Sequence, residues 1–429
     1  MRRGLLFLQC ILLALLMEVE GRAQERPNGF YLTTPLSLSA GYDQNFVVNS
    51  TTQSDTVSIL TSPTLSWIAS THRTSFSADY QPEFEIFAHD QNLNAWNHSA
   101  TLRYSYRINS RLSLDAGDSF LSTSDASRQL AESQFLLPLG RFQENSVFAG
   151  LKYRLDHRTI FFFRLDHAIT TMALRGPVGN GLDQMAYAGS LTLDHTVNRH
   201  HSFTGGYAYL HVRPLDGVGT AGYSYQAVHS LHAGYMYTVN PGLIFRVTGG
   251  VVRGREFAYT AGGAVEKQLG GVLVMAGYQR YLSFFGGLVP SGPTAGETVP
   301  FASGLMPNSL FQAASLRIRG KLTKRVGLEF KGEVGRSNLG DRSVKSLILQ
   351  SRLDYRLSER FILFARAEYY GQNISQFSES PLSRRRYFGG LEIVLSRPPQ
   401  SEDATRKHGK IPAESTEPQS DEPRAPEEK

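Results

Sequence analysis

The sequence predicts an all-β chain folded as a transmembrane antiparallel up-and-down β-barrel of about 18 strands, with a range of roughly 16–20. Three observations predict this class. Apolar and polar residues alternate over long stretches, tight turns alternate with long polar connections, and tyrosines recur near the tight turns. Alternating strands, unequal connections and aromatic girdles are typical of barrels that span a membrane.

The first element is a predicted secretory signal peptide, residues 1–23. Met1-Arg2-Arg3 is basic, "GLLFLQCILLALLM" is apolar, and "EVEGRA" ends in small residues suited to cleavage after Ala23. A helix that spans a membrane needs about 20 apolar residues, and this apolar run is shorter, which disfavours an uncleaved anchor. Cys10 is the only cysteine and lies in this run, so the mature chain is expected to hold no disulfide or thiolate.

Residues 24–29 are expected to be a short periplasmic lead, and residues 30–396 the barrel. The chain has 40 Gly, 25 Phe and 20 Tyr but only 2 Trp, a strand-rich composition. No later stretch is a continuous apolar helix, which excludes a helical membrane protein but leaves a barrel open. The net charge is +6, yet the basic residues are interspersed with acids, so nucleic acid is not an expected partner.

Within the barrel region, eight tight turns join sixteen strands, and one strand at each end gives about eighteen. The three clearest long polar segments are Ser122–Asn145, Arg213–Ser224 and Gly286–Asn308. The tight turns are expected near Thr71-His72, Asn109-Ser110, His157-Arg158, Asn198-Arg199, Pro241-Gly242, Gly270-Gly271, Thr323-Lys324 and Ser358-Glu359.

The faces of the strands separate two architectures. In "RTSFSADYQPEFEIF", Phe76, Tyr80 and Phe84 fall on one face, opposite Asp79 and Glu83. A soluble sandwich would turn the apolar faces inward, whereas a membrane barrel turns them to lipid. Strand lengths of about 9–11 residues or more favour the barrel. So do the tyrosines at similar distances from the turns, which predict an aromatic girdle: Tyr106, Tyr153, Tyr237 and Tyr355.

The final strand, "RRRYFGGLEIVLS", places Tyr387, Leu391 and Ile393 outward, opposite Phe388 and Glu392. It resembles the closing strand that the barrel-assembly machinery recognises, although it lacks a terminal Phe. Residues 397–429 follow it, rich in Pro, Glu and Ser and without an aromatic residue. We expect a disordered periplasmic tail, either a tether to cell wall or a partner, or a plain extension.

The stretch Ser62–Gly117 carries a family resemblance. Ser62-Pro63 opens a strand, "ADYQPEF" follows the turn, and "YRINSRL" forms a hinge. The chain resembles large, mostly uncharacterised porin-like outer-membrane β-barrels of Gram-negative bacteria, some associated with exopolysaccharide or exosortase systems. The resemblance covers the first third well and the remainder by repeat style, and it implies a fold more than an activity.

Charged residues on the polar strand faces are the predicted pore-lining set. Two interpretations of this set are open. The charges form an electrostatic lining that orients small polar solutes, or they form cross-strand ion pairs that satisfy one another. Barrel closure is expected to make the early and late members neighbours. The set consists of Arg73, Asp79, Glu83, Glu85, Arg103, Arg107, Asp115, Lys152, Arg154, Arg164, Asp166, Arg317, Arg319, Lys321, Glu329, Lys331, Glu333, Arg352, Asp354, Arg366, Glu368 and Glu392.

Catalytic and metal-binding patterns are weak. His211 and His229 could meet at the extracellular rim, but spacing supplies no third ligand or carboxylate. No phosphate loop, carboxylate pair or nucleophile elbow occurs in a fitting context. We therefore expect no enzyme activity, no cofactor and no metal.

The sequence favours a porin-like passive channel for small polar or saccharide solutes, in the outer membrane with both termini periplasmic. Expected partners are outer-membrane lipid and lipopolysaccharide, the barrel-assembly machinery and small polar solutes. The alternatives are a non-conducting accessory or scaffold for envelope exopolysaccharide export, and a secreted soluble all-β binding protein. The sequence leaves the oligomeric state open.

Overall fold

A computed structural model describes residues 28–44, 54–124, 140–174, 183–215, 226–254, 257–283, 309–339, 342–374 and 382–395. These residues belong to one compact unit, Arg26–Ser396. The predicted signal peptide and tail lie outside the described residues. So do Gly286–Asn308 and most of Ser122–Asn145 and Arg213–Ser224.

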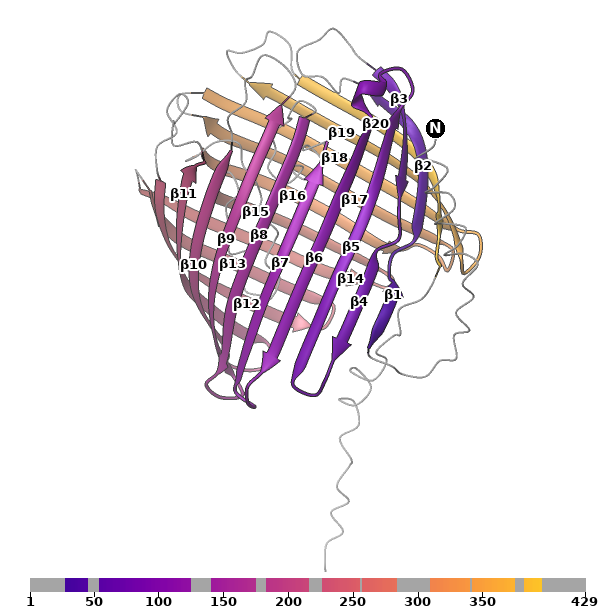
Figure 1. The fold of residues 1–429 in the computed structure, drawn as a ribbon. Helices are drawn as coiled ribbons and strands as arrows, with labels where there is room; N and C mark the ends of the chain where they lie inside the picture. Colours follow the sequence, from indigo (N-terminus) through magenta and orange to yellow (C-terminus); the bar gives the residue numbers. More distant parts are fainter. Residues whose placement is uncertain are drawn as a thin grey trace, which may run out of the picture. The chain divides into compact units, whose positions relative to one another are not determined.

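The described residues form a single antiparallel sheet of twenty strands whose inclined strands are seen in Figure 1. The strands are β1 Gly29–Leu32, β2 Leu36–Gln44, β3 Ser54–Thr61, β4 Leu65–Ser70, β5 Thr74–Phe87, β6 Ala95–Arg107, β7 Leu112–Thr123, β8 Gly140–Arg154, β9 Thr159–Leu174, β10 Gln184–Thr196, β11 His201–Pro214, β12 Gln226–Asn240, β13 Leu243–Arg253, β14 Phe257–Leu269, β15 Val272–Ser283, β16 Ser309–Lys321, β17 Val326–Leu339, β18 Arg342–Arg356, β19 Phe361–Ile374 and β20 Leu382–Ile393. A short 3₁₀ helix, η1 Gln91–Leu93, lies between β5 and β6.

The sheet closes on itself because β2 pairs with both β3 and β20. At two positions in the wall, two short strands follow one another in place of one long strand. β3 and β4 share one position, because both pair with β5. β1 and β2 share the next, because β1 pairs with β4 and β2 pairs with β3. Each interruption contains a proline, Pro35 or Pro63, which has no N–H to donate to the ladder. The barrel therefore has eighteen strand positions, and the predicted fold class is confirmed.

All eight predicted tight turns are confirmed by the strand bounds. Polar side chains close most of them. The Asn109 Oδ1 accepts hydrogen bonds from the N–H groups of Arg111 and Leu112, and Asn198 does the same for His200 and His201. Asp156 accepts from Arg158 and Thr159, and the Arg158 N–H lowers the pKa of that carboxyl. The recurrent hinge is thus a side-chain-capped turn that reverses the chain within a few residues.

We call the end of the barrel that carries these turns the turn end, and the opposite end the loop end. The first and last described strands both reach the turn end, because Gly29 pairs with Ile68 and Ile393 pairs with Phe361. No helix among the described residues is long and apolar enough to cross a membrane.

The outer face of the barrel is its apolar face. Large apolar side chains on it remain exposed, among them Leu231 at 60%, Val334 at 59% and Tyr387 at 52%. Tyr153 and Tyr355 lie on this face near the turn end, as the girdle prediction requires. A closed wall with its apolar face outward is a transmembrane β-barrel and excludes the soluble sandwich, whose apolar faces would meet inside.

Candidate functional site: the inner face of the barrel

The predicted pore-lining residues lie on one face of the wall. Strand alternation places all of them opposite the exposed apolar residues, hence on the inner face, except Arg73, which lies in the turn between β4 and β5. Their side chains differ in what they contact and in how much water reaches them. Three groups follow from these contacts.

The first group is the acids of β5, each of which accepts a hydrogen bond from a neutral side chain. Ser66 donates to Asp79 at 2.5 Å. Glu83 accepts from Thr61 at 2.9 Å and from Asn97 at 3.2 Å, and Ser124 donates to Glu85 at 2.9 Å. These carboxylates have neighbours on β3, β4 and β6, so this part of the inner face is a polar cross-strand network.

The second group forms ion pairs. Arg164 bonds Asp166 at 2.7 Å and lies 4.1 Å from the Phe148 ring centroid. Arg352 reaches Asp354 at 2.7 Å and, across β19, Glu392 at 2.8 Å. Further inner-face contacts are Lys331 with Glu333 at 3.7 Å, Arg366 with Glu368, and Lys152 over the Phe162 ring at 5.4 Å. Most of these ion pairs join residues two apart in one strand, and Arg352–Glu392 is the pair among them that joins two strands, as the cross-strand alternative expects.

The third group is cationic and exposed. Arg103, Arg317 and Arg319 lie on the inner face in the turn-end half, and no ion pair to them occurs among the described residues. Glu329 is an exposed acid near them. Asp115 is half-buried. Closer to the turns are the exposed side chains of Arg154 and Lys321 and that of Arg107, which donates to the His72 carbonyl.

The inner face also holds a buried charge cluster, which we call the seam cluster: Asp43 on β2, Arg384 and Arg386 on β20, and Glu368 on β19. Arg384 donates to both carboxylate oxygens of Asp43, at 2.9 and 2.6 Å. The Nε of Arg386 lies 3.3 Å from Asp43, and its Nη1 lies 3.5 Å from Glu368. Asp43 is 0% exposed and both arginines are 2% exposed.

The seam cluster was not among the predicted site residues, apart from Glu368. The alternation of β20 puts Arg384 and Arg386 on the same face as Glu392, so continuing that pattern toward the loop end would have found them. The expectation that closure makes the early and late sets neighbours is wrong in detail. Closure pairs β20 with β2, and Asp43 supplies the acid that faces the late strands.

The two rim histidines lie on neighbouring strands, and the strand register does not place them opposite each other. His229 is opposite Tyr209, and its Nδ1 lies 2.7 Å from the Tyr207 hydroxyl, while His211 is opposite Ala227. Among the described residues, no group of three or more His, Cys, Asp or Glu could hold a metal ion.

The fold and its inner face define the class: a transmembrane β-barrel with a charged interior. Searches against protein-family models and against curated proteins found no match. Among solved structures, OccAB4 of Acinetobacter baumannii shares 8% identity at a TM-score of 0.46, with 86% of this chain and 99% of that chain covered. OpdL of Pseudomonas aeruginosa shares 11% at 0.43, covering 85% and 99%. The siderophore receptor PirA of Pseudomonas aeruginosa shares 12% at 0.42, covering 86% and 81%. Similarity at this level transfers no activity or ligand to this chain.

Proposed function

We propose that this chain is a porin-like barrel of the Gram-negative outer membrane, a passive channel for small polar or saccharide solutes. The observation that supports it is the third group of inner-face residues. Arg103, Arg317 and Arg319 are exposed although they point away from lipid. Charged side chains that are exposed inside a closed wall are in contact with water, and a water-filled interior is what a passive channel needs.

A second function has its own support: a non-conducting barrel that acts as an accessory or scaffold in envelope polysaccharide export. The seam cluster is nearly inaccessible, and so are other inner-face side chains toward the loop end, such as Phe142 and Phe311 at 1% exposure. Water therefore reaches the described inner face unevenly along the barrel. A barrel closed at the loop end would hold water without conducting.

Planar-bilayer recording of the purified full-length protein separates the two functions. The channel predicts discrete single-channel current steps that are absent from a mock preparation of the same detergent extract. A protein that inserts, shown by heat-modifiable migration of the recovered sample, but gives no steps would overturn the channel and favour the scaffold.

A further inference from the structure

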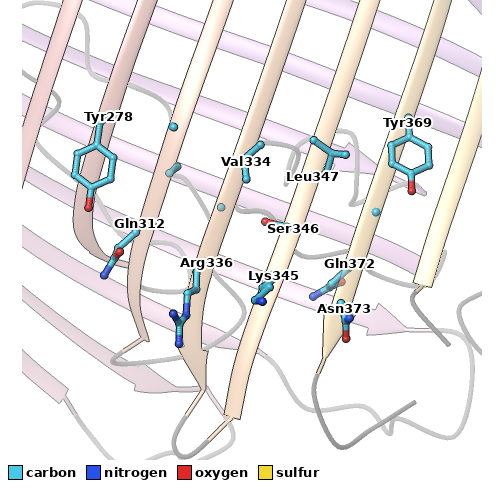
Figure 2. A pocket seen from close by; sticks show the side chains of 14 residues that line it. Tyr278, Gln312, Val334, Arg336, Lys345, Ser346, Leu347, Tyr369, Gln372 and Asn373 are labelled. Atoms are coloured by element: carbon cyan, nitrogen blue, oxygen red, sulfur yellow. The ribbon is translucent and has the colours of Figure 1, made fainter. Parts of the chain in front are cut away.

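The outer face of the barrel has a groove of about 470 Å³ over β15 to β19. Its floor is apolar and built partly from small residues, with Ala314, Val334, Leu347 and Gly371 in successive strands. Tyr278 on β15 and Tyr369 on β19 line its two sides, and Figure 2 shows them with Val334 and Leu347. Tyr369 lies across Gly371, because a Cβ there would be 2.9 Å from the Tyr369 hydroxyl oxygen.

A row of hydrogen-bond donors borders this groove on the loop-end side. Strand register aligns Arg280, Gln312, Arg336, Lys345 and Asn373 across five neighbouring strands. Figure 2 shows the last four side by side at the same end of the groove. At about 4.8 Å between strands, this donor row is roughly 19 Å wide.

The charge of the donor row is unbalanced. Arg336 and Lys345 are directly opposite each other, and like charges in that position repel. The outward positions of β15 to β20 that the structure describes contain no Asp or Glu. The Nε of Arg280 is buried and has no hydrogen-bond acceptor within the described part of the chain. The guanidinium carbon of Arg280 lies 3.6 Å from the Tyr259 ring centroid.

The donor row lies at the edge of the apolar band. From Val326 to Arg336, the outward residues of β17 are Leu328, Phe330, Gly332 and Val334, all apolar or small. Ten residues of strand cover about 34 Å, or about 25 Å along the barrel axis at a tilt of roughly 40°. An apolar band of a membrane barrel is about 25 Å tall, so the donor row is at the level of lipid headgroups.

We propose that the groove and the donor row are a binding site for a phosphorylated membrane lipid whose headgroup carries more than one anionic group. Acyl chains lie along the apolar floor between Tyr278 and Tyr369. Phosphates accept hydrogen bonds from Arg336 and Lys345, and from Arg280 at the other end of the row. The row is wider than one phosphate, which favours a polyanionic glycolipid over a singly charged phospholipid. The site is independent of whether the barrel conducts.

Lipid titration followed by native mass spectrometry tests the site. The purified full-length protein in neutral detergent is titrated with diphosphorylated lipid A, monophosphorylated lipid A and phosphatidylcholine. We expect one tightly bound diphosphorylated molecule, roughly tenfold weaker binding of the monophosphorylated form, and little binding of the neutral lipid. The double variant R336Q/K345Q should weaken diphosphorylated binding by about tenfold or more, in line with the contribution of cations near a charged surface.

The matched control is K267Q, which removes an outward cation of β14 near the turn end, away from the groove. It should leave binding unchanged, and heat-modifiable migration should show both variants folded. Equal binding by R336Q/K345Q and the unaltered protein would overturn the proposal. Equal affinity for phosphatidylcholine would also overturn it, because the groove would then be an adventitious apolar surface. A second copy of the chain bound in the groove would overturn it as well.

Discussion

At the scale of single residues, Asp43 holds the seam together. It accepts from Arg384 and lies against Arg386, and all three side chains are nearly inaccessible to water. Removing one partner of a buried ion pair leaves uncompensated charge in a medium that solvates it poorly, which costs more than the intact pair contributes. We therefore expect the cluster to favour the observed register of β2 against β20.

We predict that Asp43→Asn lowers the free energy of unfolding by about 3 kcal/mol, because the buried Arg384 and Arg386 both lose the charge of the Asp43 carboxylate. Urea titration of the protein in lipid vesicles, followed by tryptophan fluorescence, measures this. Glu329→Gln, at an exposed inner-face acid, is the control and should change the value by less than about 0.5 kcal/mol. Equal effects of the two substitutions would show that the seam charges do not stabilise closure.

Residue-level prediction from sequence succeeded where a strand period decides it. Alternation placed Glu83, Arg164 and Arg366 on the inner face because side-chain direction depends only on parity within the strand. Burial could not be predicted in the same way. Arg384 and Arg386 of β20 are buried, whereas Arg317 and Arg319 of β16 are exposed on the same inner face, a difference set by tertiary surroundings and not by local sequence. The outward cations Arg336 and Lys345 are not in the predicted set, because that set was taken from the polar faces of the strands.

At the scale of elements, closure depends on the close approach of β2 and β20. A Cβ at Gly41 would lie 2.0 Å from the backbone carbonyl oxygen of Tyr387. Backbone cannot move aside as a flexible side chain can, so any larger residue there must separate the two strands that complete the barrel. Gly249 on β13 is the opposite case, since a Cβ there meets nothing within 4 Å.

We predict that Gly41→Ala destabilises the folded barrel and lowers the temperature at which its heat-modifiable band converts, whereas Gly249→Ala leaves it unchanged or raises it slightly. The second outcome follows because alanine restricts the unfolded chain more than glycine does. Gel mobility after a temperature series checks both. A Gly41→Ala protein that converts at the same temperature as the unaltered one would contradict the steric argument.

The strand count was predictable from turns, and the interrupted strands were not. Each tight turn has a local chemical signature, such as Asn109 or Asn198 capping the next N–H groups. The breaks at Pro35 and Pro63 occur inside strand positions whose pairing resumes beyond the proline. Proline identifies a missing donor, but only the neighbouring strands decide whether the ladder resumes beyond it.

At the scale of the whole molecule, the exposed charges of the interior are mostly positive. Arg103, Arg317, Arg319 and Arg366 are exposed on the inner face, and Glu329 is the exposed acid among the described inner-face strand residues. An interior lined by one sign of charge concentrates ions of the other sign.

We therefore predict that, if current flows, the pore prefers anions. The reversal potential in a KCl gradient should have the sign of chloride selectivity, and R317Q/R319Q should move it toward zero. Raising the salt concentration should weaken the preference through screening. Potassium selectivity in the unaltered protein would contradict this account of the interior.

The level at which the outward apolar residues stop also determines which membrane can hold the barrel. From Val326 to Arg336 the wall offers hydrocarbon about 25 Å of matching surface at a tilt of roughly 40°. A hydrocarbon core of about 30 Å would either thin around the barrel or draw Arg336 and Lys345 below the headgroups, which costs free energy in proportion to depth. Bacterial outer membranes are thinner than average. We therefore expect the barrel to match a thin bilayer better than a thick one, whether or not it conducts.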